Sequence, residues 1–265
     1  MQTLKRPLLQ FLLLAIGLSA CAGLSPGAAD LAPTTTACDR AGTAGTDRVP
    51  HPAHGFDISF QYYLPPCYDS LTRASFPVLY LITLSFESTL SERDNTPLSL
   101  ADRLIRAGKM PPAILIVPGP DVNFGYDAAL AEDLVPYIDG KFRTIRDRAH
   151  RGTGGISQGA AIAARMAFQF PDTFGSVVLW SGGIDASEEE RFMQWIAPTP
   201  VERRPRVYID VGDQDDIIRF ARNLTAVLDA RHVPYEMNIG HGAHSWTYWS
   251  TRMEPDLLWL AEAWQ

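Results

Sequence analysis

The stretch GTGGISQGAAIAARMAF, residues 152–168, sets a serine between two glycines where flexible residues give way to strong helix formers. Its centre has the form G-x-S-x-G around Ser157. At a junction from strand to helix, this form is typical of a nucleophile elbow, a tight turn that holds the serine outward. Gly155 and Gly159 suit such a turn because they have no Cβ to clash where strand and helix crowd together. The stretch therefore predicts a strand, a nucleophilic serine and a helix, in that order.

Continuous apolar runs on both sides of this stretch predict the remaining core. They occupy residues 76–82, 113–119, 176–182 and 206–212. Helix-like segments alternate with them at residues 98–107, 130–142, 158–170 and 217–231. Runs that are apolar on both faces and alternate with helices indicate a mostly parallel sheet with helices on both faces, an α/β fold. Before them, residues 56–64 alternate with period two, which predicts a half-buried first strand.

Length and charge limit the class of protein. The chain has 265 residues, of which 46% are hydrophobic, enough for one large core. We see no internal repeat, so residues 55–265 are expected to form one catalytic domain. The formal net charge of −7 argues against nucleic-acid binding, which needs clustered Lys and Arg.

The N-terminal residues have the features of an export leader. Lys5 and Arg6 precede an apolar stretch, residues 8–18, that is too short to span a bilayer. The sequence LSAC at 18–21 resembles a bacterial lipobox, which predicts a signal peptide over 1–20 and a lipid on Cys21. The mature protein would be exported and held on the membrane, facing the periplasm or the cell surface. An ordinary signal peptide cut near the same position is the alternative.

Residues 21–54 are rich in Ala, Gly, Thr, Pro and Ser and have no hydrophobic periodicity, so we expect a flexible tether. His51 and His54 are expected to be solvated histidines of this tether rather than metal ligands, because no further ligand side chain stands nearby to complete a site. Cys38 and Cys67 form an even pair in an oxidising compartment, which favours a disulfide. Such a bridge would close a loop of about 30 residues and stabilise the fold by about 3 kcal/mol. Two free thiols are the alternative.

A nucleophilic serine needs a base and a carboxylate that orients the base, and on this fold they follow in the order acid, then histidine. Asp213, Asp215 and Asp216 come directly after the run that ends at 212. His241 and His244 lie between strand-like residues and an aromatic segment. The alternative is that the aspartates cap the helix that follows and the histidines make ordinary hydrogen bonds in a loop.

Several segments resemble the esterase family of the α/β-hydrolase superfamily that includes relatives of esterase D, feruloyl esterases, enterochelin esterases and mycolyltransferase antigens. They are GISQGAAIAARMAFQFPDTFGSVVLWSGG, IDVGDQDD and GHGAHSWTYW, together with VLYLI, AGKMPPAILIVPG and EDLVPYIDGKFRT. The resemblance covers most of residues 56–265. It implies an α/β-hydrolase fold with Ser157 as nucleophile, Asp215 as acid and His244 as base. It also implies hydrolysis of small acyl or aryl esters through an acyl-enzyme, with no metal or organic cofactor.

One segment departs from the family. Relatives usually carry a His-Gly or similar pair where this chain has Thr83-Leu84. By position, the backbone N–H groups of Ser85 and Gln158 would form the oxyanion hole. Two other functions remain open: an acyltransferase that uses the same three residues, or a surface lipoprotein that uses the fold to bind a glycan or a protein. The last helix carries aromatic side chains that could serve such binding: Trp246, Tyr248 and Trp249. We expect them to pack this helix against the sheet rather than to bind a glycan or a protein.

Overall fold

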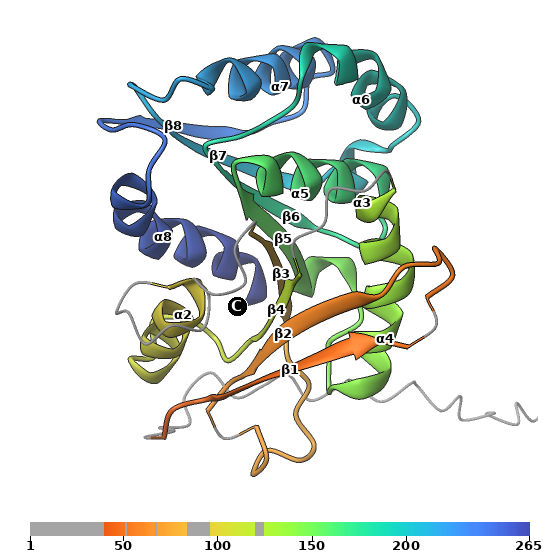
Figure 1. The fold of residues 1–265 in the computed structure, drawn as a ribbon, viewed down its shortest axis with the longest axis vertical. Coiled ribbons are helices and arrows are strands. Elements are labelled where there is room, and N and C mark those ends of the chain that lie inside the picture. The colour runs from red at the N-terminus through yellow and green to blue at the C-terminus, as the bar shows by residue number, and fades with distance from the viewer. Residues whose placement is uncertain (1–39, 51, 67, 84–95, 120–124) are drawn as a thin grey trace, which may run out of the picture.

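The computed structural model describes residues 40–50, 52–66, 68–83, 96–119 and 125–265. Within these residues, eight strands form one sheet in the order β1-β2-β4-β3-β5-β6-β7-β8 (Figure 1). Strands β3 to β8 run parallel, whereas β1 and β2 pair antiparallel. The strands are β1 Thr43–Val49, β2 Ile58–Leu64, β3 Val78–Ile82, β4 Ile114–Pro118, β5 Arg151–Ile156, β6 Ser176–Trp180, β7 Arg206–Gly212 and β8 Glu236–Gly240. The predicted mostly parallel sheet is therefore confirmed.

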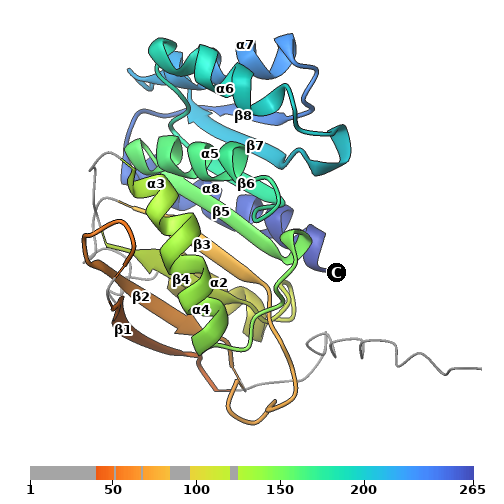
Figure 2. The ribbon, with the colours of Figure 1, turned by 90° about the vertical axis from the view of Figure 1, so that its right-hand side faces the viewer.

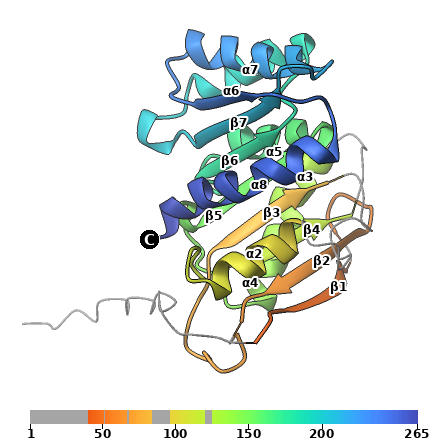
Figure 3. The ribbon, with the colours of Figure 1, turned by 90° about the vertical axis from the view of Figure 1, so that its left-hand side faces the viewer.

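Helices cover both faces of the sheet. Figure 2 shows α3 to α6 lying over one face, and Figure 3 shows α2 and α8 over the other. The helices are α2 Pro97–Arg106, α3 Tyr126–Ala129, a π-turn Leu130–Leu134, α4 Val135–Lys141, α5 Gln158–Gln169, α6 Glu189–Ile196, α7 Ile218–Ala230 and α8 Trp246–Ala261. Short 3₁₀ turns lie at Arg148–His150, Ala186–Glu188, Val201–Arg203 and Glu262–Trp264.

The two covered faces explain why β3, in the middle of the sheet, is apolar along its whole length. All five residues of β3 are buried. Val78, Tyr80 and Ile82 belong to the core cluster under α3 to α7, whereas Leu79 and Leu81 belong to the cluster under α2 and α8. Successive strand side chains point to opposite faces, so a strand between two helical layers needs apolar residues at every position.

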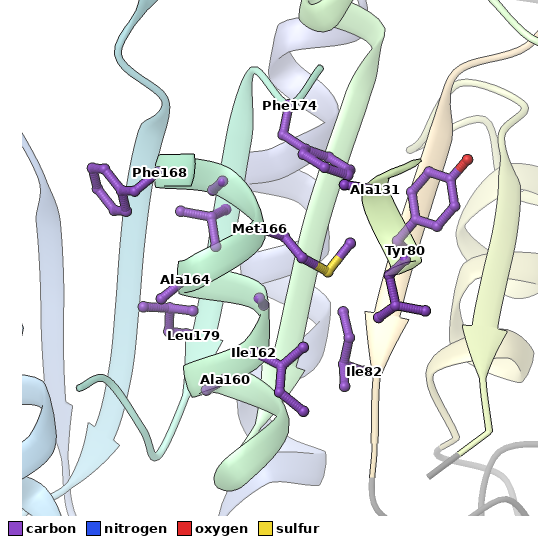
Figure 4. Packing of buried hydrophobic residues seen from close by; sticks show 14 of the residues in the cluster. Tyr80, Ile82, Ala131, Ala160, Ile162, Ala164, Met166, Phe168, Phe174 and Leu179 are labelled. Atoms are coloured by element: carbon purple, nitrogen blue, oxygen red, sulfur yellow. The ribbon is translucent and has the colours of Figure 1, made fainter. Parts of the chain in front are cut away.

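Helix α5 lies close to the sheet because much of its buried side is alanine. Ala160, Ala163, Ala164 and Ala167 are all fully buried. Figure 4 shows Ile162 and Met166 of this helix pointing toward Tyr80 and Ile82 of β3. The resulting contact fixes the start of α5 beside the ends of β3 and β5, where Ser157 lies.

The prediction of a flexible tether through residue 54 is wrong for residues 43–49. They form β1, which pairs with β2 from Thr43 opposite Leu64 to Val49 opposite Ile58. Six of its seven side chains are exposed or half-buried, so the strand lacks the apolar pattern that identifies a buried strand. Backbone hydrogen bonds to β2 hold it in place, and the Gly42 N–H donates to Asp102 Oδ1 at 2.7 Å just before it.

His54 is also not the solvated tether histidine that we expected. Its Nδ1 lies 2.8 Å from Asp133 Oδ2, and its Nε2 lies 3.3 Å from Glu132 Oε2. Both carboxylates belong to the π-turn between α3 and α4. The histidine thus joins the segment before β2 to the helical layer.

Candidate active site

Ser157 lies at the junction of β5 and α5, with backbone angles of φ 58° and ψ −120°. A positive φ is uncommon for a residue with a side chain, so this turn is strained. The Ser157 N–H donates to the Trp180 carbonyl at 2.9 Å, which ties the turn to β6. A Cβ on Gly155 would lie 2.3 Å from the Gly159 backbone, and one on Gly159 would lie 2.1 Å from the Ile82 carbonyl oxygen. Both glycines of the motif are therefore required by close backbone contacts.

A histidine contacts this serine, and an aspartate contacts the histidine. His244 Nε2 lies 3.0 Å from Ser157 Oγ. On the other side of the ring, His244 Nδ1 lies 3.0 Å from Asp215 Oδ2 and 3.1 Å from Oδ1. The Asp215 side chain is 0% exposed and that of His244 is 27% exposed. The structure therefore brings the three predicted residues into one hydrogen-bonded row, in which a proton could pass from the serine hydroxyl to the imidazole.

Two loops that are hydrogen-bonded to each other carry the acid and the histidine. The Asp213 N–H donates to the Gly240 carbonyl at 2.7 Å, and the Gln214 N–H donates to the Gly242 carbonyl at 2.8 Å. Asp215 accepts a further bond from the Ile217 N–H at 3.0 Å, which orients its carboxylate. The first two bonds fix the loop after β7 against the loop after β8.

A buried polar network lies next to these two loops. Asp210 of β7 is fully buried and accepts from Tyr248 Oη at 2.6 Å and from Arg252 Nε at 2.9 Å. Asn238 of β8 donates to the same carboxylate at 2.9 Å. The network joins β7, β8 and α8, the elements next to the two loops. Burial, followed by the hydrogen bond to Asp210, raises the pKa of Tyr248 well above its usual range.

A second buried carboxyl, Asp256, lies on α8 near this network. Its Oδ2 accepts from Trp180 Nε1 at 2.6 Å, and its Oδ1 has no hydrogen-bond partner among the residues that the structure describes. Burial, assisted by the negative charge of Asp210, raises the pKa of Asp256 to about 7. The group therefore carries a proton through most of the acidic range.

The rival candidates lie close to these residues. His241 Nδ1 lies 3.2 Å from Asp213 Oδ2, but this pair is exposed. Asp216 is exposed and belongs, with Asp215 and His244, to a group whose possible metal-ligand atoms all lie within 4.8 Å of one another. Within that group His244 Nδ1 hydrogen-bonds to Asp215 and His244 Nε2 lies 3.0 Å from Ser157 Oγ, so both nitrogens of this histidine already have partners.

The family model described as "Putative esterase" matches residues 52–260 of this chain. The chain belongs to this esterase family. It is 24% identical to the uncharacterized protein YjcH of Bacillus subtilis over 143 residues, which is 50% of this chain and 58% of the relative. It is 27% identical to an endo-1,4-beta-xylanase/feruloyl esterase of Xylanibacter ruminicola over 209 residues, which is 72% of this chain and 28% of the relative. The chain thus spans less than two thirds of either curated relative.

Among solved structures, a ferulic acid esterase superposes on this chain with a TM-score of 0.72 at 20% identity. The match covers 85% of this chain and 99% of that one. At this identity the likeness shows the fold, which is the α/β-hydrolase fold that the resemblance implied.

Several residues that the sequence analysis singled out lie outside the described part of the chain. Ser85, Cys21, Cys38 and Cys67 are among them, so the predictions for the oxyanion hole, the lipid and the disulfide remain predictions. Gln158, the other predicted oxyanion donor, is the first residue of α5. None of the helices in the described residues is long and apolar enough to cross a membrane.

Sequence reasoning gave the aromatic residues of α8 a packing role and missed their polar contacts. Tyr248 is buried, as expected, but its hydroxyl also donates to Asp210. Trp249 stands against His244, with ring centroids 4.9 Å apart and planes at 89°. The segment GHGAHSWTYW, through its resemblance to the family, marks the histidine, but nothing in its spacing shows that a tryptophan five residues after His244 contacts the imidazole.

Proposed function

We propose that this protein is a serine carboxylic-ester hydrolase that uses Ser157, His244 and Asp215 as a catalytic triad. The observation that carries the proposal is the row of contacts from Ser157 Oγ through both His244 nitrogens to the buried Asp215 carboxylate, at 3.0 Å for each step. Membership of the esterase family supports it independently. The elbow, which holds Ser157 at a positive φ between two required glycines, supports it further.

In this mechanism, His244 Nε2 takes the proton from Ser157 Oγ as the oxygen attacks the ester carbonyl carbon. The tetrahedral intermediate collapses, and protonated His244 gives its proton to the departing alkoxide, which leaves as an alcohol. The acyl group then remains on Ser157. Asp215 accepts the hydrogen bond from His244 Nδ1 and stabilises the imidazolium in each step.

The acyl-enzyme is hydrolysed by the same groups in reverse order. His244 takes a proton from water, hydroxide adds to the acyl carbon, and the second tetrahedral intermediate expels Ser157 with the proton from His244. We assign oxyanion stabilisation to the backbone N–H groups of Gln158 and Ser85. Gln158 is the first residue of α5, and the N-terminus of a helix favours negative charge.

The substrates proposed are small acyl or aryl esters. The aryl class is supported by the relatives named as a feruloyl esterase and a ferulic acid esterase. The test is hydrolysis of p-nitrophenyl acetate and of methyl ferulate by the wild type and by Ser157→Ala. Hydrolysis of either ester that disappears in a folded Ser157→Ala variant supports the proposal, and equal turnover by both proteins would refute it. An added alcohol that intercepts most of the acyl group would instead indicate an acyltransferase.

We also infer that the protein is exported and anchored through a lipid on Cys21, because a positive n-region and a short apolar stretch precede LSAC. Cys21→Ser should move the protein from the membrane fraction to the soluble fraction, and mass spectrometry of the wild type should find the lipid. A membrane-bound Cys21→Ser variant together with an unlipidated wild type would contradict this inference.

A disulfide between Cys38 and Cys67 remains part of the proposal. Arg40 and Ala41, which follow Cys38, line the same surface hollow as Pro65 and Tyr68, which flank Cys67. Peptide mapping without reductant should recover the two cysteines in one linked pair of peptides, and two free thiols would contradict it.

A further inference from the structure

Ser181 is a buried residue with an unusual backbone conformation beside the candidate active site. It follows β6 directly, is 0% exposed and has φ 51°. The next two residues, Gly182 and Gly183, could adopt a positive φ at no steric cost but do not. A strained serine where glycine would be relaxed suggests that its side chain is needed.

The Ser181 hydroxyl has a specific partner. Its Oγ accepts a hydrogen bond from Trp249 Nε1 at 2.7 Å. An indole N–H can only donate, so a half-buried tryptophan needs an acceptor of this kind. The Ser181 N–H donates in turn to the Asp210 carbonyl at 2.8 Å, which holds the serine between β6 and β7. Trp249 is thereby hydrogen-bonded to the residue that follows the carboxyl end of β6.

The Trp249 ring in turn contacts the imidazole of His244. The ring centroids are 4.9 Å apart and the planes are nearly perpendicular, at 89°. The contacts with Ser157 and Asp215 fix the positions of the two nitrogens of His244. Because both nitrogens lie in the plane of the ring, these contacts only weakly oppose tilting of the ring about the line through the two nitrogens. A perpendicular aromatic ring beside the imidazole opposes that tilt.

We propose that Trp249 and Ser181 are a pair of positioning residues, in which the Ser181 hydroxyl orients the Trp249 indole and the indole holds His244 in line between Ser157 and Asp215. The inference rests on the proposed role of His244 as general base. Neither residue needs to touch the substrate. Their effect is on the fraction of time during which His244 Nε2 faces Ser157 Oγ, a geometric requirement that catalysis by a general base imposes.

The experiment compares Trp249→Phe, Ser181→Ala and the double variant with the wild type on p-nitrophenyl acetate. Phe keeps an aromatic ring but cannot donate, and Ala keeps the Cβ at position 181 but cannot accept. Each single variant should lower kcat by about 10-fold and leave KM within about two-fold, since positioning affects the chemical step. The double variant should be no slower than the worse single variant, because both changes remove the same hydrogen bond.

Trp259→Phe is the matched control on the same helix. Its indole also donates one hydrogen bond, to Glu236 Oε1 at 2.6 Å, but at the opposite end of α8 from His244. This variant should keep the wild-type kcat. An equal loss of kcat in Trp259→Phe, unchanged kcat in both Trp249→Phe and Ser181→Ala, or losses that multiply in the double variant would each overturn the proposal.

A measurement without substrate separates this inference from the proposed function. In the proton NMR spectrum, the His244 Nδ1–H signal, identified by its absence in His244→Gln, should be sharp in the wild type and in Trp259→Phe. It should broaden through faster exchange in Trp249→Phe and Ser181→Ala. An equally sharp signal in all four proteins would overturn the positioning role, whereas failure of the wild type to hydrolyse any ester would count against the proposed function alone.

Discussion

The loops after β7 and β8 build two histidine–aspartate pairs from the same residue types at nearly the same spacing. His244 Nδ1 lies 3.0 Å from Asp215 Oδ2, and His241 Nδ1 lies 3.2 Å from Asp213 Oδ2. Their surroundings differ: the Asp215 and His244 side chains are 0% and 27% exposed, whereas those of Asp213 and His241 are 47% and 82% exposed. Only His244 has its second nitrogen against Ser157.

The exposed pair has a structural explanation. Asp213 accepts from the Gly242 N–H at 3.0 Å and so holds the two loops together. This bond, and then the one to His241, keep the pKa of Asp213 below its usual range. A histidine–aspartate contact therefore does not by itself identify a catalytic pair. Burial of the acid and a nucleophile on the far side of the ring make the difference.

The largest effect is expected when the two histidines are exchanged for alanine one at a time. His244→Ala should lower kcat/KM for ester hydrolysis by about 10⁴-fold or more, as should Ser157→Ala, because nucleophile and base act as one unit. His241→Ala should change kcat/KM by less than about five-fold, since its imidazole does not reach the serine. Circular dichroism checks that each variant is folded. A larger loss in His241→Ala than in His244→Ala would exchange the roles of the two pairs.

The three aspartates of the loop after β7 give the next largest contrast. Asp215→Asn should reduce kcat by roughly 10³- to 10⁴-fold, because an amide cannot both hold the required tautomer and stabilise the imidazolium. Asp216→Asn and Asp213→Asn serve as matched controls and should retain activity within about ten-fold. Steady-state kinetics on one activated ester rank the three, and a ranking led by Asp216→Asn would move the acid to that position.

The stability of the protein is expected to depend on pH through Asp256, the buried carboxyl near the polar network around Asp210. The pKa of Asp256 is raised from 3.8 to about 7 in the folded protein, so the native state binds this proton more tightly than the unfolded state. Its contribution to stability is therefore complete below about pH 4 and is lost as the pH rises to about 7. Asp256→Asn has no charge to bury and should escape this loss.

Relative to the wild type, Asp256→Asn should gain on the order of 2–4 kcal/mol in free energy of unfolding between pH 4 and pH 8, at about 1.4 kcal/mol per pKa unit. Urea denaturation at both pH values measures the change. A constant difference between variant and wild type across this range would show that Asp256 titrates normally.

The smallest effect is expected from removing the exposed pair altogether. The double variant His241→Ala/Asp213→Asn should lower Tm by less than about 3 °C, because an exposed ion pair contributes little and an asparagine oxygen can still accept from the Gly242 N–H. Thermal unfolding followed by circular dichroism is sufficient. A much larger loss would mean that the exposed pair is a main support of the two loops.

The sequence predicts the centre of this molecule better than its rim. The runs that became β3, β4, β6 and β7 are mostly apolar because helices cover both faces, and such runs are visible without a structure. β1 was missed because its polar side chains carry no pattern and backbone pairing alone places it. α6 lies within residues 183–205, a stretch whose conformation the sequence pattern does not determine.

The candidate site divides in the same way. The order of serine, aspartate and histidine follows from the fold, but spacing cannot choose between pairs whose members are only two or three residues apart. The resemblance to a family made that choice, and the structure places those residues in contact. The contact of Trp249 with His244 depends on how α8 packs across the sheet, which no local pattern encodes.

In the proposed mechanism, Ser157 is a nucleophile that is activated by His244 and not by the exposed His241. The most direct measurement is the rate at which a fluorophosphonate probe labels the protein, with the adduct located by peptide mass spectrometry. We expect one adduct, on Ser157, formed at similar rates in the wild type and His241→Ala and at least about 100-fold more slowly in His244→Ala. Labelling at another residue, or equal rates in His244→Ala and the wild type, would contradict it.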